Sequence, residues 1–164
     1  MMSRMRTLSQ PWLGLDLGTR RIGVALSNAL GIAQPLLTIE RTQPRRDQRS
    51  ILRLARRHSC VGIVVGNPLH LSGDISPQTE RVHRFVDGLK AIIAESHDHP
   101  ALPIHLWDER LSTAEAHAAL QAAGHDPADR DTRRHKVDQL AAAIILQGWL
   151  DAQSGAVTLL PPDA

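Results

Sequence analysis

The sequence predicts an α/β protein built on a mixed five-stranded sheet with helices on both faces. Three short apolar segments follow one another between residues 12 and 41 with only tight turns between them, a pattern typical of an antiparallel meander. Beyond residue 44, amphipathic helical segments alternate with two further apolar segments that are typical of strands. Most strand positions are apolar, as expected of a sheet that is covered on both sides.

The chain has the length of one domain. Its 164 residues, 42% of them hydrophobic, can form a single core without disulfides. No linker, repeat or low-complexity tract divides it. We therefore expect a single domain over residues 1–164, with a core of about residues 12–152 and a short tail at each end.

The meander begins with two strands, Trp12–Gly18 and Arg21–Ser27, which the tight turn Gly18-Thr19-Arg20 joins. A third strand, Ala33–Arg41, follows a turn at Leu30-Gly31. Both connections are too short to cross over the sheet, so the three strands are predicted to be antiparallel.

An arginine-rich helix over about Arg45–His58 comes next, with an apolar side around Leu52. Five arginines occupy the rest of its surface: Arg45, Arg49, Arg53, Arg56 and Arg57. The β-branched segment Cys60–Gly66 indicates a buried strand that ends at Asn67-Pro68, and a polar loop over His70–Ser76 follows.

The second half of the chain alternates in the same way. Ser76 predicts the N-cap of a helix, with Pro77 at its first position. Pro103–Trp107 is predicted as a short strand. Ser112–Glu115 has the pattern of a capping box, which begins a helix that Gly124 stops.

A charged loop over Gly124–His135 and a last helix over about Lys136–Ala152 complete the prediction. Three consecutive alanines, Ala141–Ala143, are expected to let this helix approach the sheet closely.

Composition excludes several classes of protein. No apolar run approaches the roughly 18 residues needed to span a bilayer, and the first ten residues lack the apolar stretch of a signal peptide. The single cysteine, Cys60, excludes an internal disulfide and a zinc site built from several cysteines. We therefore expect a cytoplasmic protein with no membrane partner.

Positive charge is concentrated in the first part of the chain. The net charge is +2, but residues 1–60 carry 11 Arg against 3 acids, and the remainder is acidic. Of the 19 basic residues 17 are arginine, which suits bidentate phosphate contacts, and at 2% the aromatic residues are too few for base stacking to dominate. The pattern suits nucleic acid bound through its phosphates and an ordinary solvated surface equally well.

Four acids stand out. Asp16 interrupts an apolar strand, Asp108 and Glu109 are adjacent at the end of another, and Asp138 lies in the first turn of the predicted last helix. Singly, Asp16 could be a strand-end acid that reaches water, and Asp138 could serve the helix dipole. Together, without thiolates or paired histidines, they suit Mg²⁺ or Mn²⁺. Two such ions about 4 Å apart can activate a water and stabilise the leaving oxygen of a phosphodiester.

Four segments carry a resemblance to a known family: GLDLGTRRIGVALS, VVGNPLHLSGDISPQTERV, HLWDERLSTAEA and HKVDQLAAAIILQGWLD. They resemble the YqgF/RuvX family, and the resemblance extends from about Leu13 to Asp151. It implies an RNase H-like fold, in keeping with the predicted order of strands and helices. It also implies a nuclease, of a family described both as Holliday junction resolvases and as enzymes that mature the 5′ end of pre-16S rRNA.

The resemblance assigns roles to the acids. It implies that Asp16, Glu109 and Asp138 are catalytic and hold the metal, with Asp108 as an additional candidate ligand. One departure is the strand-end motif, close to GLPL in the family and Gly66-Asn67-Pro68-Leu69 here, in which Asn67 adds a polar side chain near the site.

Candidate contacts to nucleic acid surround these acids. Gly14 and Gly18 flank Asp16 and are expected to leave room for a metal and a phosphate. The candidate nucleic-acid ligands are Arg20, Arg21, Asn67, Ser72, Gln78, Arg110, Arg133, Arg134 and Lys136. For the turn, for the Asn67–Gln78 loop and for the arginine-rich helix, an ordinary solvated surface is the alternative.

The predicted function is a metal-dependent hydrolase, an endonuclease rather than an exonuclease, that cuts precursor rRNA, branched DNA or both. Cutting a branched junction needs two active sites and therefore a homodimer. A non-catalytic nucleic-acid-binding module of the same fold is the alternative. A remote one is an ATP-binding domain of the sugar-kinase or actin type. Asp16–Thr19 resembles the first phosphate loop of those proteins, but they clamp the nucleotide between two such domains.

Overall fold

The centre of the molecule is a five-stranded sheet with the order β3-β2-β1-β4-β5. A computed structural model describes residues 8–69, 72–97 and 101–155. The strands are β1 (Trp12–Leu17), β2 (Arg21–Ser27), β3 (Ala33–Glu40), β4 (Gly62–Asn67) and β5 (Ile104–Asp108). β1, β2 and β3 are antiparallel, whereas β4 runs parallel to β1 and β5 parallel to β4. The predicted mixed sheet with its three-stranded meander is confirmed.

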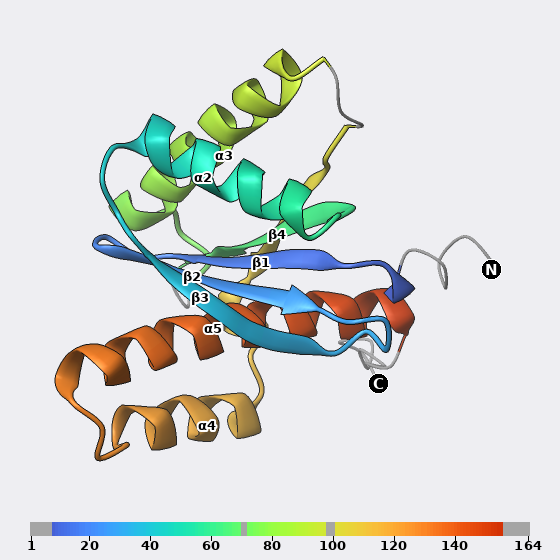
Figure 1. Cartoon of the computed structure of the whole chain (residues 1–164). Coiled ribbons are helices and arrows are strands. Elements are labelled where there is room, and N and C mark those ends of the chain that lie inside the picture. Colours follow the sequence, from blue (N-terminus) through green and yellow to red (C-terminus); the bar gives the residue numbers. More distant parts are fainter. Residues whose placement is uncertain (1–7, 70–71, 98–100, 156–164) are drawn as a thin grey trace.

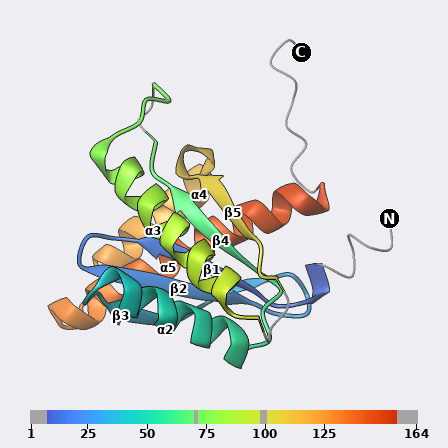
Figure 2. The ribbon, with the colours of Figure 1, turned by 90° about the horizontal axis from the view of Figure 1, so that it is seen from above.

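Helices cover both faces of the sheet, as predicted. Figure 1 shows α2 (Pro44–Arg57) and α3 (Pro77–Glu95) on one side and α5 (Arg130–Ser154) on the other, with α4 (Ala114–Gly124) packed outside α5. Figure 2, seen from above, shows α2 and α3 lying side by side over the strands. A short 3₁₀ helix, η1 (Glu109–Leu111), follows β5 directly. None of the described helices has the length and apolar content needed to cross a membrane.

The side chains of β1 alternate between two cores. Leu13, Leu15 and Leu17 pack with residues of α2 and α3, whereas Trp12 packs with residues of α5. Because successive strand residues point to opposite faces, Asp16 lies on the same face as Trp12. The acid that interrupts the apolar strand therefore faces the last helix.

Glycines on the strands bring α5 close to the sheet. A Cβ added at Gly23 would overlap the backbone carbonyl of Asp138, and one added at Gly14 would lie 2.9 Å from the carbonyl oxygen of Ala142. The expected close approach is thus confirmed for Ala142, which is fully buried. The expectation that Gly14 leaves room for a metal is wrong, because α5 occupies that space.

The last helix begins earlier than predicted. Asp129 caps it by accepting hydrogen bonds from the amides of Asp131 and Thr132, so six residues of the predicted loop are helical. Asp138 consequently lies in the third turn of the helix and not in the first. A helix-dipole role for Asp138 is therefore wrong, since that effect fades within the first turn.

Two other helix starts can be compared with their predictions. Ser76 caps α3 as predicted, and Thr79 completes its capping box. The capping box predicted at Ser112 is wrong: Thr113 caps α4, and the Ser112 hydroxyl instead donates to the carbonyl of Glu109. His70 and Leu71 of the predicted polar loop lie outside the described residues, as do residues 1–7 and 156–164 of the expected tails.

Candidate active site

The sheet topology brings three acids to one edge. β1, β4 and β5 are parallel, so their carboxyl ends meet there. Asp16 is the last but one residue of β1, and Glu109 directly follows β5. Asp138 reaches the same place from α5, because its backbone lies on Gly23, the residue opposite Asp16 in the β1–β2 ladder.

Gly66 makes space for Glu109. It follows Val65, the partner of Leu15 in the β1–β4 ladder, and therefore lies beside Asp16. A Cβ at Gly66 would overlap the carboxylate of Glu109 and would lie 2.6 Å from Cδ1 of Ile145. The absence of a side chain at this strand end is what lets the Glu109 carboxylate lie over the sheet.

The electrostatics of the site are dominated by like charge. Burial, and after it the charges of Glu109 and Asp138, raise the pKa of Asp16 to about 7 from an ordinary value of 3.8. Burial, and after it the charge of Asp108, raise the pKa of Glu109. The three carboxylates therefore share one environment in which negative charge is in excess.

Arg21 balances part of this charge. Its Nε donates to Oδ2 of Asp138 at 2.6 Å, and both side chains are only 21% exposed. Arg21 is predicted as a nucleic-acid ligand. In this structure it is the first residue of β2 and faces the acid, not the solvent.

The side chains of Asp108 and Glu109 point in different directions, as expected of adjacent residues at a strand end. Nε and Nη2 of Arg110 donate to the carboxylate of Asp108, with a shortest distance of 2.6 Å, and the amide of Arg110 also donates to it. These contacts lower the pKa of Asp108. Asp108 also caps η1, the turn that begins with Glu109.

The donor set fits a hard divalent cation by its chemistry, since all three side chains offer carboxylate oxygens. Excess negative charge around Asp16 is the kind that a cation relieves. As the side chains stand, no group of three His, Cys, Asp or Glu residues in the described part of the chain is arranged to hold a metal ion. Oδ2 of Asp138 accepts its hydrogen bond from Arg21.

Three polar candidates, Asn67, Ser72 and Gln78, form hydrogen bonds within the protein. Nε2 of Gln78 donates to the carbonyl of Leu17 at 3.0 Å and so ties α3 to the end of β1. Oδ1 of Asn67 bonds with Nε2 of His83 at 3.1 Å. The Ser72 hydroxyl, in the exposed loop before α3, donates to Asp74.

The remaining basic candidates lie in the β1–β2 turn and in α5. Arg20 is exposed in the β1–β2 turn. At the start of α5, Arg133 donates to the carbonyl of Asp126 at 3.2 Å, and Nζ of Lys136 lies 3.4 Å from the carboxylate of Asp126. Arg134 is half-buried.

Sequence reasoning missed two residues that shape this edge. Nη1 of Arg41 donates to the carbonyl of Gly18 at 2.8 Å and so fixes the turn after Asp16. His83 bonds to Asn67 from α3. The spacing of His83, four residues after Thr79 in a predicted helix, offered a signal for it. The contact of Arg41 joins residues 23 apart and offered none.

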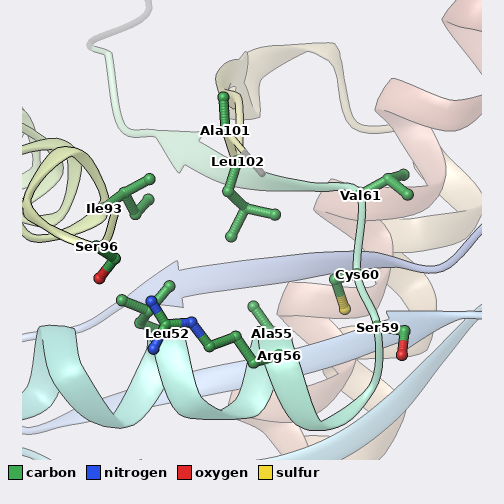
Figure 3. Close-up of a pocket in the computed structure, with 10 residues that line it drawn as sticks. All are labelled: Leu52, Ala55, Arg56, Ser59, Cys60, Val61, Ile93, Ser96, Ala101 and Leu102. Atoms are coloured by element: carbon green, nitrogen blue, oxygen red, sulfur yellow. The ribbon is translucent and has the colours of Figure 1, made fainter. Parts of the chain in front are cut away.

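A hollow lies at the end of the sheet opposite to the three acids (Figure 3). Its volume is about 410 Å³, and its lining comes from α2, from α3 and from the segments that precede β4 and β5. Cys60 lies in it, and burial raises the pKa of this thiol to about 11, so it is not a reactive thiolate. The acids lie at the opposite ends of the same strands, and this hollow is therefore separate from the candidate site.

Comparison with known proteins identifies relatives of this chain. Curated relatives carry the name "Putative pre-16S rRNA nuclease". The protein of Myxococcus xanthus is 40% identical over 152 residues, which cover 92% of this chain and 94% of the relative. The protein of Moorella thermoacetica is 42% identical over 140 residues, covering 85% of this chain and 93% of the relative. That of Syntrophus aciditrophicus is 43% identical over 143 residues, covering 87% and 89%.

Solved structures of Holliday junction resolvases share the fold. Thermus thermophilus RuvC in complex with a Holliday junction substrate superposes with a TM-score of 0.56 at 15% identity, covering 89% of this chain and 96% of RuvC. The yeast mitochondrial resolvase Ydc2 gives a TM-score of 0.53 at 15% identity, covering 92% and 84%. The RNase H-like fold implied by the sequence is thereby confirmed. The family model "RuvX: Holliday junction resolvase" matches residues 10–152, and the chain belongs to the RuvX family.

Proposed function

We propose that this chain is a divalent-metal-dependent endonuclease whose catalytic residues are Asp16, Glu109 and Asp138. The observation that carries the proposal is the gathering of three carboxylates at one edge of the sheet, where burial and, after it, the charges of Glu109 and Asp138 raise the pKa of Asp16 to about 7. Like charges held together against their repulsion are typical of sites that bind a cation or transfer protons. Carboxylate oxygens are the ligands that Mg²⁺ and Mn²⁺ prefer, which supports one or two such ions here.

In this proposal Asp16, Glu109 and Asp138 hold the metal, which supplies an activated water and charge for the leaving oxygen. Asp138 becomes available when Arg21 leaves it. A substrate phosphate offers Arg21 another anion at hydrogen-bond distance, so substrate binding and release of Asp138 favour each other.

The neighbouring residues position these groups. Asp108, held by Arg110, caps the turn that carries Glu109 and so fixes where the Glu109 carboxylate lies. Gln78 fixes the end of β1 next to Asp16. Arg20, exposed in the turn after β1, is placed to contact the phosphate backbone of the substrate.

The proposed substrate is the 5′ end region of pre-16S rRNA, because relatives about 40% identical over most of this chain carry that name. Such an enzyme acts in the cytoplasm. The family model's description favours a second candidate, four-way DNA junctions. Junction cleavage requires two active sites and hence a homodimer, whereas trimming of RNA does not.

Side-by-side cleavage tests this proposal. The purified protein is incubated with a pre-16S rRNA fragment and with a four-way DNA junction, each with Mg²⁺, with Mn²⁺ and with EDTA. We expect metal-dependent cuts in the RNA that Asp16→Asn abolishes. Binding without cleavage under every condition would identify a non-catalytic nucleic-acid-binding module instead. Cleavage of the junction alone, by a dimer in light scattering, would establish the second candidate.

A further inference from the structure

One flank of α2 carries charge that the proposed active site does not use. Six arginines of this helix are exposed: Arg45, Arg46, Arg49, Arg53, Arg56 and Arg57. At about 100° per residue they fall within about 120° of the helix circumference. This α2 arginine stripe lies to one side of the buried face that Ile51, Leu52 and Ala55 form.

No acid of α2 neutralises the stripe. The helix has one acid, Asp47, which is buried and accepts hydrogen bonds from the amide and hydroxyl of Thr42. Within residues 8–69, 72–97 and 101–155, no arginine of the stripe forms an ion pair.

In the free protein, only Arg56 and Arg57 of the stripe, in the last turn of α2, complement the helix dipole. Arginines at positions 45, 49, 53 and 57 repel one another at i,i+4 spacing, and Arg45 and Arg46 oppose the helix dipole in the first turn. An external array of anions would reverse both effects.

The dimensions of the stripe point to a nucleic-acid backbone. From Arg45 to Arg57 it extends about 18 Å along the helix axis. Phosphates of one strand of a DNA duplex advance about 3.4 Å per base pair, so the stripe spans about five base pairs of such a duplex. Guanidinium groups bind phosphate bidentately, and α2 has no aromatic residue that could stack on a base. Recognition of the backbone, independent of base sequence, follows from this composition.

A hollow lies between the β1–β2 turn and the beginning of α2. Its volume is about 530 Å³, and Arg20, Arg81 and Pro44 are among its lining residues. Pro44 is the first residue of α2, and Arg20 lies in the turn that follows the strand of Asp16. Glu40, the acid in the lining, already bonds with His135. Basic surface therefore continues from the end of β1 to the beginning of α2.

We propose that the α2 arginine stripe is a second nucleic-acid-binding surface, which holds the backbone of a duplex flank of the substrate. The cut itself takes place at the acidic edge, the edge of the sheet where Asp16, Glu109 and Asp138 lie, on the other side of the β1–β2 turn. The inference rests on the proposed function for the identity of the substrate, but not for the binding itself.

Binding of an RNA hairpin whose stem is longer than the stripe tests this proposal. The variant Arg49→Gln/Arg53→Gln is compared with a matched control, Arg84→Gln/Arg130→Gln, which removes two exposed arginines from α3 and α5. Affinity is measured by fluorescence anisotropy over a range of KCl concentrations. All proteins carry Asp16→Asn so that no cutting occurs, and circular dichroism verifies their folding.

We expect the slope of log affinity against log salt concentration to fall by about 2 in the stripe variant and to stay unchanged in the control. Equal losses in both variants would show an effect of net charge only and would overturn the proposal, as would no loss in either. Loss of binding to phosphatidylserine vesicles without loss of RNA binding would also overturn it and would assign the stripe to membranes. Because cutting is absent throughout, failure of the proposed nuclease activity leaves this result intact.

Discussion

Arg21 and Asp138 meet across 117 residues of sequence, with the guanidinium Nε 2.6 Å from the carboxylate Oδ2. The contact joins the first residue of β2 to the third turn of the last helix. It also places a positive charge beside the candidate site and occupies one of the two carboxylate oxygens of Asp138.

Replacement of Arg21 by Gln should therefore strengthen metal binding. We expect Mn²⁺ affinity, measured by isothermal titration calorimetry, to rise about threefold to tenfold, while the free energy of unfolding falls by about 1 kcal/mol. The control is Arg84→Gln, which removes an exposed ion pair with Glu80 at 4.0 Å and should alter neither quantity. Weaker Mn²⁺ binding in Arg21→Gln would mean that Arg21 does not compete for Asp138.

Asp16→Asn should abolish cleavage and leave the fold intact. The amide removes a charge from the most crowded position of the site, so the metal loses a ligand while the repulsion among the carboxylates is relieved. Cleavage assays and circular dichroism provide the two measurements. A well-folded Asp16→Asn protein with native activity would contradict the metal-dependent mechanism.

The same side chain makes stability depend on pH. The pKa of Asp16 is about 7 in the folded chain and 3.8 as an ordinary value, so between these values the folded chain binds more protons than the unfolded one. The free energy of unfolding should therefore fall as pH rises from about 4 to about 7. Asp16→Asn should lessen this fall, which thermal unfolding in EDTA at several pH values would measure. Parallel curves for the two proteins would refute the assignment.

Glu109→Gln should lose most of the activity and Asp108→Asn less. The Glu109 carboxylate lies at Gly66 beside Asp16, whereas that of Asp108 is held by Arg110. Turnover of a pre-16S rRNA fragment compares the two variants, and a crystal soaked in Mn²⁺ should show ion density between Asp16, Glu109 and Asp138. Density on Asp108, with Glu109 turned away, would reverse their roles.

Two glycines should be sensitive to a single methyl group, for different reasons. Gly23→Ala would push the backbone of α5 off the sheet and should cost about 1–3 kcal/mol of stability. Gly66→Ala would displace the Glu109 carboxylate and should lower activity more than stability. Gly124→Ala, at the end of α4 with no atom of another segment within 4 Å, is the control and should lower neither. Thermal unfolding and cleavage rates separate the three cases.

Local sequence patterns were sufficient to predict most strands and helices of the fold. The three strands of the meander match their predicted bounds to within one residue, because apolar runs and tight turns are specified by adjacent residues. The first turns of α5 were not predictable in the same way. Over Arg130–His135 four of the six side chains are charged and none is apolar, so the segment lacks the apolar period that identifies a helix against a sheet.

The acids themselves were visible in the sequence, because a charge in an apolar strand is unusual. Their surroundings were not. The pairing of Arg21 with Asp138 and the seat of Asp138 on Gly23 both depend on how α5 crosses the sheet. Such contacts between distant segments leave no trace in residue spacing, and Arg21 was accordingly predicted to face nucleic acid.

The seat of Asp138 on Gly23 has a consequence during synthesis of the chain. Asp16 lies in the first strand and Asp138 in the last helix, so the acidic edge is complete only after α5 has been made and has docked. A nascent chain that still lacks α5 can form the meander, but it cannot bring its carboxylates together. Any activity that depends on all three acids would therefore arise only after the whole domain has been made.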